Sequence, residues 1–187
     1  MPGRADALRN RQHVLATARR LFAEKGASNV SIDEIAAAAQ VGKGTIYRGF
    51  GDRAGLAVAL LDDAERGLQE RLIRGRPPLG PGAPPRERVC AFVRAYTALL
   101  ERHLELIVES QTASPGARFR IGAFHAWREH LGLLAREAGL DDALVPDLLL
   151  GALDGSLYQH LRRDRGFSAR RIRDSVERLA LAAFRSE

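Results

Sequence analysis

The stretch "SIDEIAAAAQVGKGTIYRGF" (residues 31–50) decides the fold class, because it holds two helical segments separated by a glycine turn. Ser31 and Glu34 have the spacing of a capping box, in which the serine hydroxyl accepts a hydrogen bond from the amide three residues later. Gln40-Val41-Gly42 ends the first segment, and only a short second segment follows. Together with an amphipathic helix expected over residues 9–25, the pattern predicts a helix-turn-helix unit.

The short second helix carries polar side chains of the kinds that contact DNA. A helix of about eight residues spans about 12 Å, which is comparable to the width of the major groove of B-DNA. Lys43 and Arg48 can contact phosphate or guanine, and Thr45 suits a base edge. Tyr47 can donate to a phosphate, and the helix start at Ser31 favours an anion. For each side chain, plain packing or solvation is the alternative, so the prediction concerns the unit as a whole.

The same region resembles the DNA-binding domain of the tetracycline-repressor (TetR) family of bacterial regulators. The resemblance covers about residues 11–60 and includes "VLATARRLFAEKGA" and "VSIDEIAAAAQVGKGTIYRGFGDRAGL". It implies an all-helical homodimer, a ligand-responsive C-terminal domain, and two recognition helices in successive major grooves of the DNA. Gly42 stands where the family commonly has Ser, and Gly49 where it commonly has His. Arg53 keeps the cation that opens the family's fourth helix, which implies a phosphate contact.

The rest of the chain has helical periodicity, and no stretch alternates in the manner of a strand. We therefore expect an all-α protein, with residues 1–52 as the helix-turn-helix DNA-binding domain and residues 53–187 as a helical effector-binding and dimerisation domain. Asp52 is the expected N-cap of the first helix in the second domain. The proline-rich segment at 76–85 is expected to be a linker or loop. The second domain is predicted to contain helices over residues 53–74, 86–110, 118–138, 142–163 and from about 168 onward.

Aromatic and polar side chains on the middle helices are candidates for an effector cavity. The resemblance predicts such a cavity, and aromatic walls with a few polar groups are what an apolar ligand requires. The alternative is that these side chains simply form the core, since an aromatic residue at helical spacing is usually buried. The candidate ligand-binding residues are Tyr96, His103, Phe124, Trp127 and Tyr158. The acidic pair Glu105 and Glu109 is expected to lie on a solvated face.

The last two predicted helices are apolar on more than one side. Such helices must bury their second face somewhere, and a partner subunit is the expected place in a chain of this size. Gly151 and Gly155 lie one turn apart and would permit close approach of two helices, either at the interface or within the subunit. The candidate interface residues are Leu148, Gly151, Gly155, Val176, Leu179 and Ala183.

Composition excludes several classes of function. The 187 residues carry a net charge of +6. The single cysteine, Cys90, cannot form an intrachain disulfide, which favours a cytoplasmic protein. No run of residues is long and apolar enough to span a membrane, so no membrane partner is expected. The sequence has no motif for an enzyme, a metal site or a cofactor. We therefore expect a ligand-responsive regulator, acting as a repressor, that binds a palindromic operator in double-stranded DNA as a dimer and is released by a small-molecule effector. The alternative is an architectural DNA-binding protein that has no sequence preference and no effector.

Overall fold

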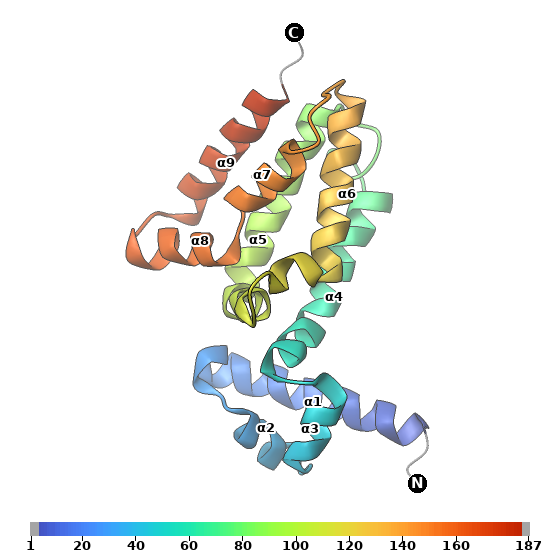
Figure 1. The fold of residues 1–187 in the computed structure, drawn as a ribbon, viewed down its shortest axis with the longest axis vertical. Coiled ribbons are helices and arrows are strands. Elements are labelled where there is room, and N and C mark those ends of the chain that lie inside the picture. Colours follow the sequence, from blue (N-terminus) through green and yellow to red (C-terminus); the bar gives the residue numbers. More distant parts are fainter. Residues whose placement is uncertain (1–3, 185–187) are drawn as a thin grey trace.

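A computed structural model describes residues 4–184, and throughout that range the regular structure is helical without a strand (Figure 1). The prediction of an all-α fold is therefore confirmed. The main helices are α1 (Arg4–Lys25), α2 (Ile32–Ala38), α3 (Lys43–Phe50), α4 (Arg53–Arg74), α5 (Pro85–Thr112), α6 (Gly122–Glu137), α7 (Val145–Ala152), α8 (Gly155–Gln159) and α9 (Ala169–Ala183). Short turns of other helical types follow α1, α5 and α8, namely η1 (Ala27–Asn29), η2 (Ala117–Arg120) and η3 (His160–Asp164).

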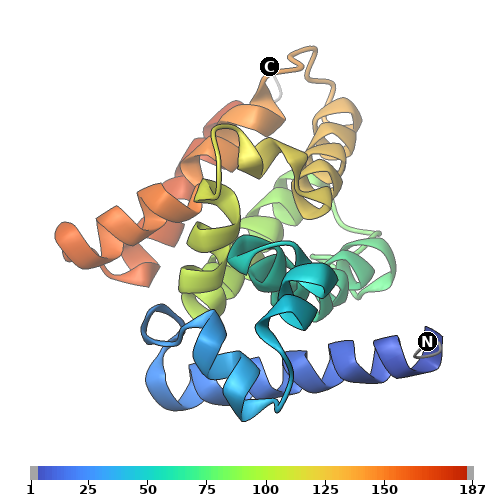
Figure 2. The same ribbon diagram turned by 60° about the horizontal axis from the view of Figure 1, so that its bottom comes forward.

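The helices form two bodies, joined end to end by α4. Helices α1, α2 and α3 make the smaller body, and Figure 2 shows α1 running beneath the other helices. Its core contains Val14, Ala18, Ile35 and Ile46, each at most 1% exposed. The larger body has α5 at its centre, with α4, α6, α8 and α9 packed around it.

Helix α4 contributes to both cores. Leu56 and Leu60 pack with the core of the smaller body, whereas Leu61, Leu68 and Leu72 pack with the core of the larger one. The smaller body therefore extends in space beyond residue 52, into the first two turns of α4.

The helix starts that depend on local capping lie where they were expected. The Ser31 hydroxyl accepts from the Glu34 amide at 3.1 Å, and the Asp52 carboxylate accepts from the Gly55 amide at 2.7 Å. The Glu34 side chain accepts from Lys25 and also from the Ser31 backbone, as the capping box predicts, and both contacts lower the pKa of Glu34.

The single helix predicted over residues 142–163 is wrong. The chain breaks after α7, where Asp154 adopts an extended conformation and its carboxylate accepts from the Leu157 amide at 2.9 Å. Asp154 thereby caps the separate helix α8, which passes into the π-type turn η3. A second departure is a kink inside α5 at His103, whose φ and ψ are −131° and 22°. Among the described residues, no helix is long and apolar enough to cross a membrane.

Candidate nucleic-acid interface

The turn between α2 and α3 is fixed by backbone contacts and by one buried side chain. The Val41 amide donates to the Ala36 carbonyl at 3.0 Å, and Gly42 precedes α3 in an extended conformation without a side-chain cap. Ile46, at 1% exposed, anchors α3 to α1 and α2. Because this apolar side faces inward, the polar side of the short helix faces solvent.

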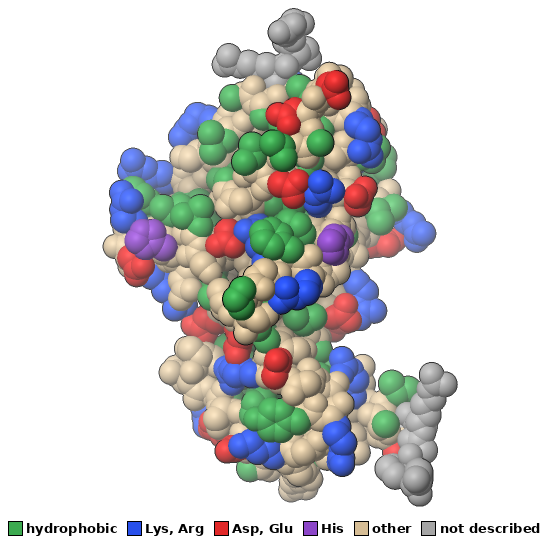
Figure 3. Space-filling view, in the orientation of Figure 1, with side chains coloured by type: hydrophobic (Ala, Val, Ile, Leu, Met, Phe, Trp, Pro, Cys, Tyr) green, Lys and Arg blue, Asp and Glu red, His purple; other side chains and the backbone are tan. Residues whose placement is uncertain are grey.

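The polar side of α3 presents most of the side chains expected there. Lys43, Tyr47 and Arg48 are exposed, Thr45 is half-buried, and Ser31 is exposed at the start of α2. Figure 3 shows Lys and Arg side chains around a hydrophobic patch on this body. The structure thus groups cations, a hydroxyl and an aromatic ring on one small surface.

The contacts that Lys43 and Arg48 make within the protein are weak enough to leave both side chains available for binding. Lys43 pairs with Asp33 at 2.6 Å, and the hydrogen bond to Asp33 raises the pKa of Lys43. Both partners are more than half exposed, so the pair contributes little and can open readily. Arg48 makes only a long hydrogen bond to the Thr45 hydroxyl, at 3.4 Å.

Arg53 has a different role from the expected phosphate contact. Its guanidinium donates to the carbonyl of Val30 and, at 2.6 Å, to that of Ala27, and it pairs with Glu109 on α5 at 2.5 Å. These bonds direct the cation into the junction between the two bodies. The phosphate contact is therefore corrected to a contact that joins α4, the segment before α2, and α5.

Arg11 supports α3 and was missed by the sequence analysis. Its guanidinium donates to the Gly49 carbonyl at 2.6 Å and lies over the Phe50 ring, 4.4 Å from the ring centre. Arg11 thus holds the end of α3 where glycine replaces the family's usual side chain. No signal in the sequence links these positions, since they are brought together only by packing of α1 against α3.

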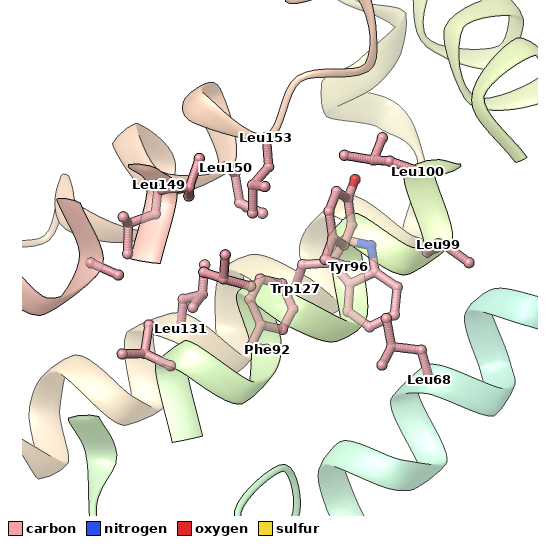
Figure 4. Close-up of a cluster of buried hydrophobic side chains, with 14 of the residues drawn as sticks. Leu68, Phe92, Tyr96, Leu99, Leu100, Trp127, Leu131, Leu149, Leu150 and Leu153 are labelled. Atoms are coloured by element: carbon pink, nitrogen blue, oxygen red, sulfur yellow. The ribbon is translucent and has the colours of Figure 1, made fainter. Parts of the chain in front are cut away.

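Two of the aromatic candidates for a ligand cavity, Tyr96 and Trp127, contact each other in the core (Figure 4). Trp127 and Tyr96 lie with ring centres 6.0 Å apart, and Phe92 stacks on Tyr96 at 5.6 Å. Phe124 is also buried, and burial raises the pKa of Tyr96 to about 12. Tyr158 is fully buried, and its hydroxyl donates to Glu101 at 2.8 Å. In this conformation these aromatic side chains are part of the hydrophobic core.

His103 lies apart from the aromatic core. It sits at the kink of α5, half-buried, beside a hollow that Phe22 and Leu60 also line. Burial and the neighbouring Arg102 lower the pKa of His103, so the ring is neutral at physiological pH. His103 is therefore separated from the other four ligand candidates.

The candidate dimer residues divide into an exposed group and a buried group. Leu148 and Leu179 are 67% and 57% exposed, Gly151 is exposed, and Ala183 is half-buried. Val176 is only 4% exposed and packs into its own core. Gly155 is also buried, and a Cβ there would lie 3.0 Å from Ile107 of α5. These last two positions are corrected to internal packing.

The described part of the chain offers neither a cluster of metal-binding side chains nor a reactive cysteine. No group of three or more His, Cys, Asp or Glu side chains is arranged there to hold a metal ion. Cys90 is buried, and burial raises the pKa of its thiol, which keeps the thiol protonated.

Taken together, a short exposed helix on a three-helix core defines a helix-turn-helix protein with a second, larger helical domain. Residues 14–60 match the family described as bacterial regulatory proteins, tetR family. Over these residues the chain is similar to the DNA-binding region of TetR-family regulators.

A curated relative with a similar N-terminal region is an HTH-type transcriptional regulator of Staphylococcus aureus. It is 43% identical over 53 residues, which cover 28% of this chain and 29% of the relative. The chain therefore matches less than a third of the length of such relatives.

Two solved structures match over nearly the whole fold. One is Thermus thermophilus FadR, a TetR-family repressor in complex with lauroyl-CoA, at 20% identity and a TM-score of 0.67, covering 95% of this chain and 96% of that one. The other is a putative transcriptional regulator from Saccharomonospora viridis in complex with choline, at 22% identity and a TM-score of 0.62, covering 90% of this chain and 94% of that one. At such identities the likeness establishes the shared fold.

Proposed function

We propose that the protein is a ligand-responsive transcriptional regulator, acting as a repressor, that binds a palindromic DNA operator as a dimer. The observation that carries the proposal is the exposed polar side of α3, with Lys43, Tyr47 and Arg48 held outward by the buried Ile46. A helix of this length and charge suits the major groove. Half-sites of the operator are expected about 34–36 Å apart, one turn of the DNA.

The dimer is proposed to form through the exposed apolar side chains of α7 and α9. Leu148 on α7 and Leu179 on α9 are both largely exposed, and Leu144 beside α7 is 64% exposed. Large apolar side chains grouped on neighbouring helices are typical of an interface between subunits. A second copy of the chain would cover them and bring two recognition helices into one dimer, one for each half-site.

Two structural links can carry a change in the larger domain to α3. One is α4, whose leucines belong to both cores. The other is α5, where Glu105 accepts from the Ser28 amide at 3.0 Å and Glu109 pairs with Arg53. The pair expected on a solvated face is thus bonded to the smaller body. An effector that favours one arrangement of these links would change operator affinity, and operator binding would change effector affinity by the same factor.

The first test is selection of bound DNA from a random duplex library at about 150 mM salt. A palindromic motif is the expected result, and Arg48→Ala should reduce its enrichment. DNA recovered without a motif would favour the alternative of an architectural DNA-binding protein. Effectors would then be screened by release of the selected DNA, beginning with acyl-CoA thioesters and choline, which occupy the two matching structures.

A further inference from the structure

A hollow of about 480 Å³ lies at the junction of the two bodies, outside the aromatic core. Residues from α1, η1 and α4 line one side, and residues from α5 and η3 line the other. Its volume falls in the range of about 300–1,000 Å³ that is typical of small-molecule sites. The junction is visible as the narrow waist of the molecule in Figure 3.

The kink in α5 shapes one wall of this hollow. All six residues from 101 to 106 line it. In a straight helix, consecutive side chains point in directions about 100° apart, so six in a row could not face one space. The non-helical backbone at His103 turns this segment toward the hollow.

The wall is apolar on both sides of the junction. Phe22 of α1 and Leu60 of α4 lie on one side, and Leu104 of α5 lies on the other. Leu106 also lines the hollow and packs against both cores. A ligand with an apolar body would therefore contact both domains at once.

The rim of the hollow carries one uncompensated positive charge. Arg19 pairs with Asp63 at 2.6 Å, and Arg163 pairs with Glu105 at 2.9 Å. Arg102 is exposed and has no ion pair with any of the described side chains.

The acids beside Arg102 are already engaged. Glu101 accepts from Arg162 at 2.7 Å and from Tyr158 at 2.8 Å. Arg102 is thus the cation that remains available to a bound anion.

We propose that this junction hollow binds a small amphiphilic monoanion. The apolar body lies against Phe22, Leu60 and Leu104, and the anionic group pairs with Arg102. Because such a ligand contacts α1 and α5 together, it stabilises one arrangement of the two bodies over others. The effect on operator affinity rests on the proposed function, whereas binding itself does not.

The test uses the full chain and three ligands with the same eight-carbon body, octanoate, octanol and octylammonium, in isothermal titration calorimetry. Octanoate should bind most tightly. Arg102→Ala should weaken octanoate binding at least about tenfold, since a hydrogen bond to a charged group contributes about 1.5–3 kcal/mol. Arg86→Ala is the matched control, because Arg86 is an exposed, unpaired arginine on the same helix outside the hollow, and its binding should equal that of the wild type.

Two further measurements locate the ligand. Ala23 is exposed and lines the hollow, so Ala23→Phe should block binding without disturbing either core. Trp127 is the single tryptophan and is 2% exposed in the aromatic core, so its emission should not change when octanoate binds the wild type.

Three results would overturn the proposal: no octanoate binding, equal binding of octanol, or binding that is unaffected by Arg102→Ala and Ala23→Phe. A change in Trp127 emission with unaltered binding to Ala23→Phe would place the ligand in the core instead. No DNA enters these measurements, so failure here is distinguishable from failure of the proposed function.

Discussion

Replacing Arg53 should destabilise the protein rather than weaken a phosphate contact. The guanidinium donates to two backbone carbonyls, those of Ala27 and Val30, and pairs with Glu109, whose side chain is only 24% exposed. Hydrogen bonds to a charged group contribute about 1.5–3 kcal/mol each. In the variant, water can reach this half-buried junction and hydrogen-bond to some of the groups that contacted Arg53. We therefore expect Arg53→Ala to lower the free energy of unfolding by about 3 kcal/mol in total.

That loss converts to a measurable shift in melting temperature. For a chain of this size, about 1 kcal/mol corresponds to about 2–4 °C, so the melting temperature should fall by about 6–12 °C. Circular dichroism at 222 nm would follow the unfolding. Arg66→Ala is the control, because Arg66 is an exposed arginine on the same helix that pairs only with neighbouring acids. Its melting temperature should change by no more than about 2 °C.

The partner residue gives a second check on the same reasoning. Glu109→Gln should also destabilise the protein, and the double variant should lose less than the sum of the two single variants. An unchanged melting temperature for Arg53→Ala, with the salt dependence of operator binding reduced by about one phosphate contact, would refute the structural role. Fluorescence anisotropy of labelled operator at several salt concentrations would supply that measurement.

Three other predictions concern the DNA surface and the core. Arg48→Ala should weaken operator binding by about 1–3 kcal/mol in the anisotropy assay, whereas Arg66→Ala should not, and equal affinities would remove Arg48 from the contact surface. Tyr47→Phe should cost about 0.5–1.5 kcal/mol of operator affinity if the hydroxyl donates to phosphate, and a smaller loss would leave only a role for the ring. Burial lowers the pKa of His130 to about 4, below its unfolded value of 6.5, so the unfolded chain takes up the proton first as pH falls. His130 therefore contributes a decline of up to about 3 kcal/mol between pH 6.5 and 4, whereas burial raises the pKa of Glu65 to about 7 and gives that carboxyl the opposite effect. The His130 contribution should appear in urea titrations as the difference between the wild type and His130→Gln, and an identical pH dependence of the two proteins would contradict the assignment.

The features that sequence predicted well are those set by near neighbours along the chain. Ser31 and Asp52 cap their helices because each accepts a hydrogen bond from an amide three residues later. Gly42 interrupts the two helices of the DNA-binding unit where the turn was expected. Such contacts follow from the order of residues alone, so the first four helices and the exposed side of α3 could be predicted.

The features that sequence missed depend on contacts between distant segments. Glu105 and Glu109 have the spacing of a solvated acidic pair, and nothing local reveals that their partners lie at Ser28 and Arg53. The aromatic residues were correctly placed on inward faces, but their spacing could not distinguish a ligand cavity from rings packed against each other.

The break between α7 and α8 was missed for a different reason. The leucine-rich periodicity on both sides of residue 154 favours one continuous helix. Capping by the Asp154 side chain, together with its ion pair to Arg118 at 2.7 Å, stabilises the break instead. The periodic pattern was thus overridden by one polar side chain, which caps α8 and pairs with an arginine on η2.

The sharing of α4 between two cores bears on how such proteins can be recombined. Leu56 and Leu60, at 1% and 5% exposed, complete the core of the DNA-binding body, yet they follow the glycine-rich turn at which a sequence-based boundary falls. A chimaera that joins this DNA-binding body to another sensor at residue 52 would inherit foreign side chains at both positions and leave its core mismatched. A junction after Leu60 would keep that core whole, but the residues of the other sensor would then begin at position 61, inside α4, and would have to continue this helix in register with their own core. The DNA-binding body of this chain therefore ends in the middle of α4. Because the same helix also belongs to the larger body, exchanging one body without altering the other requires a change inside this helix.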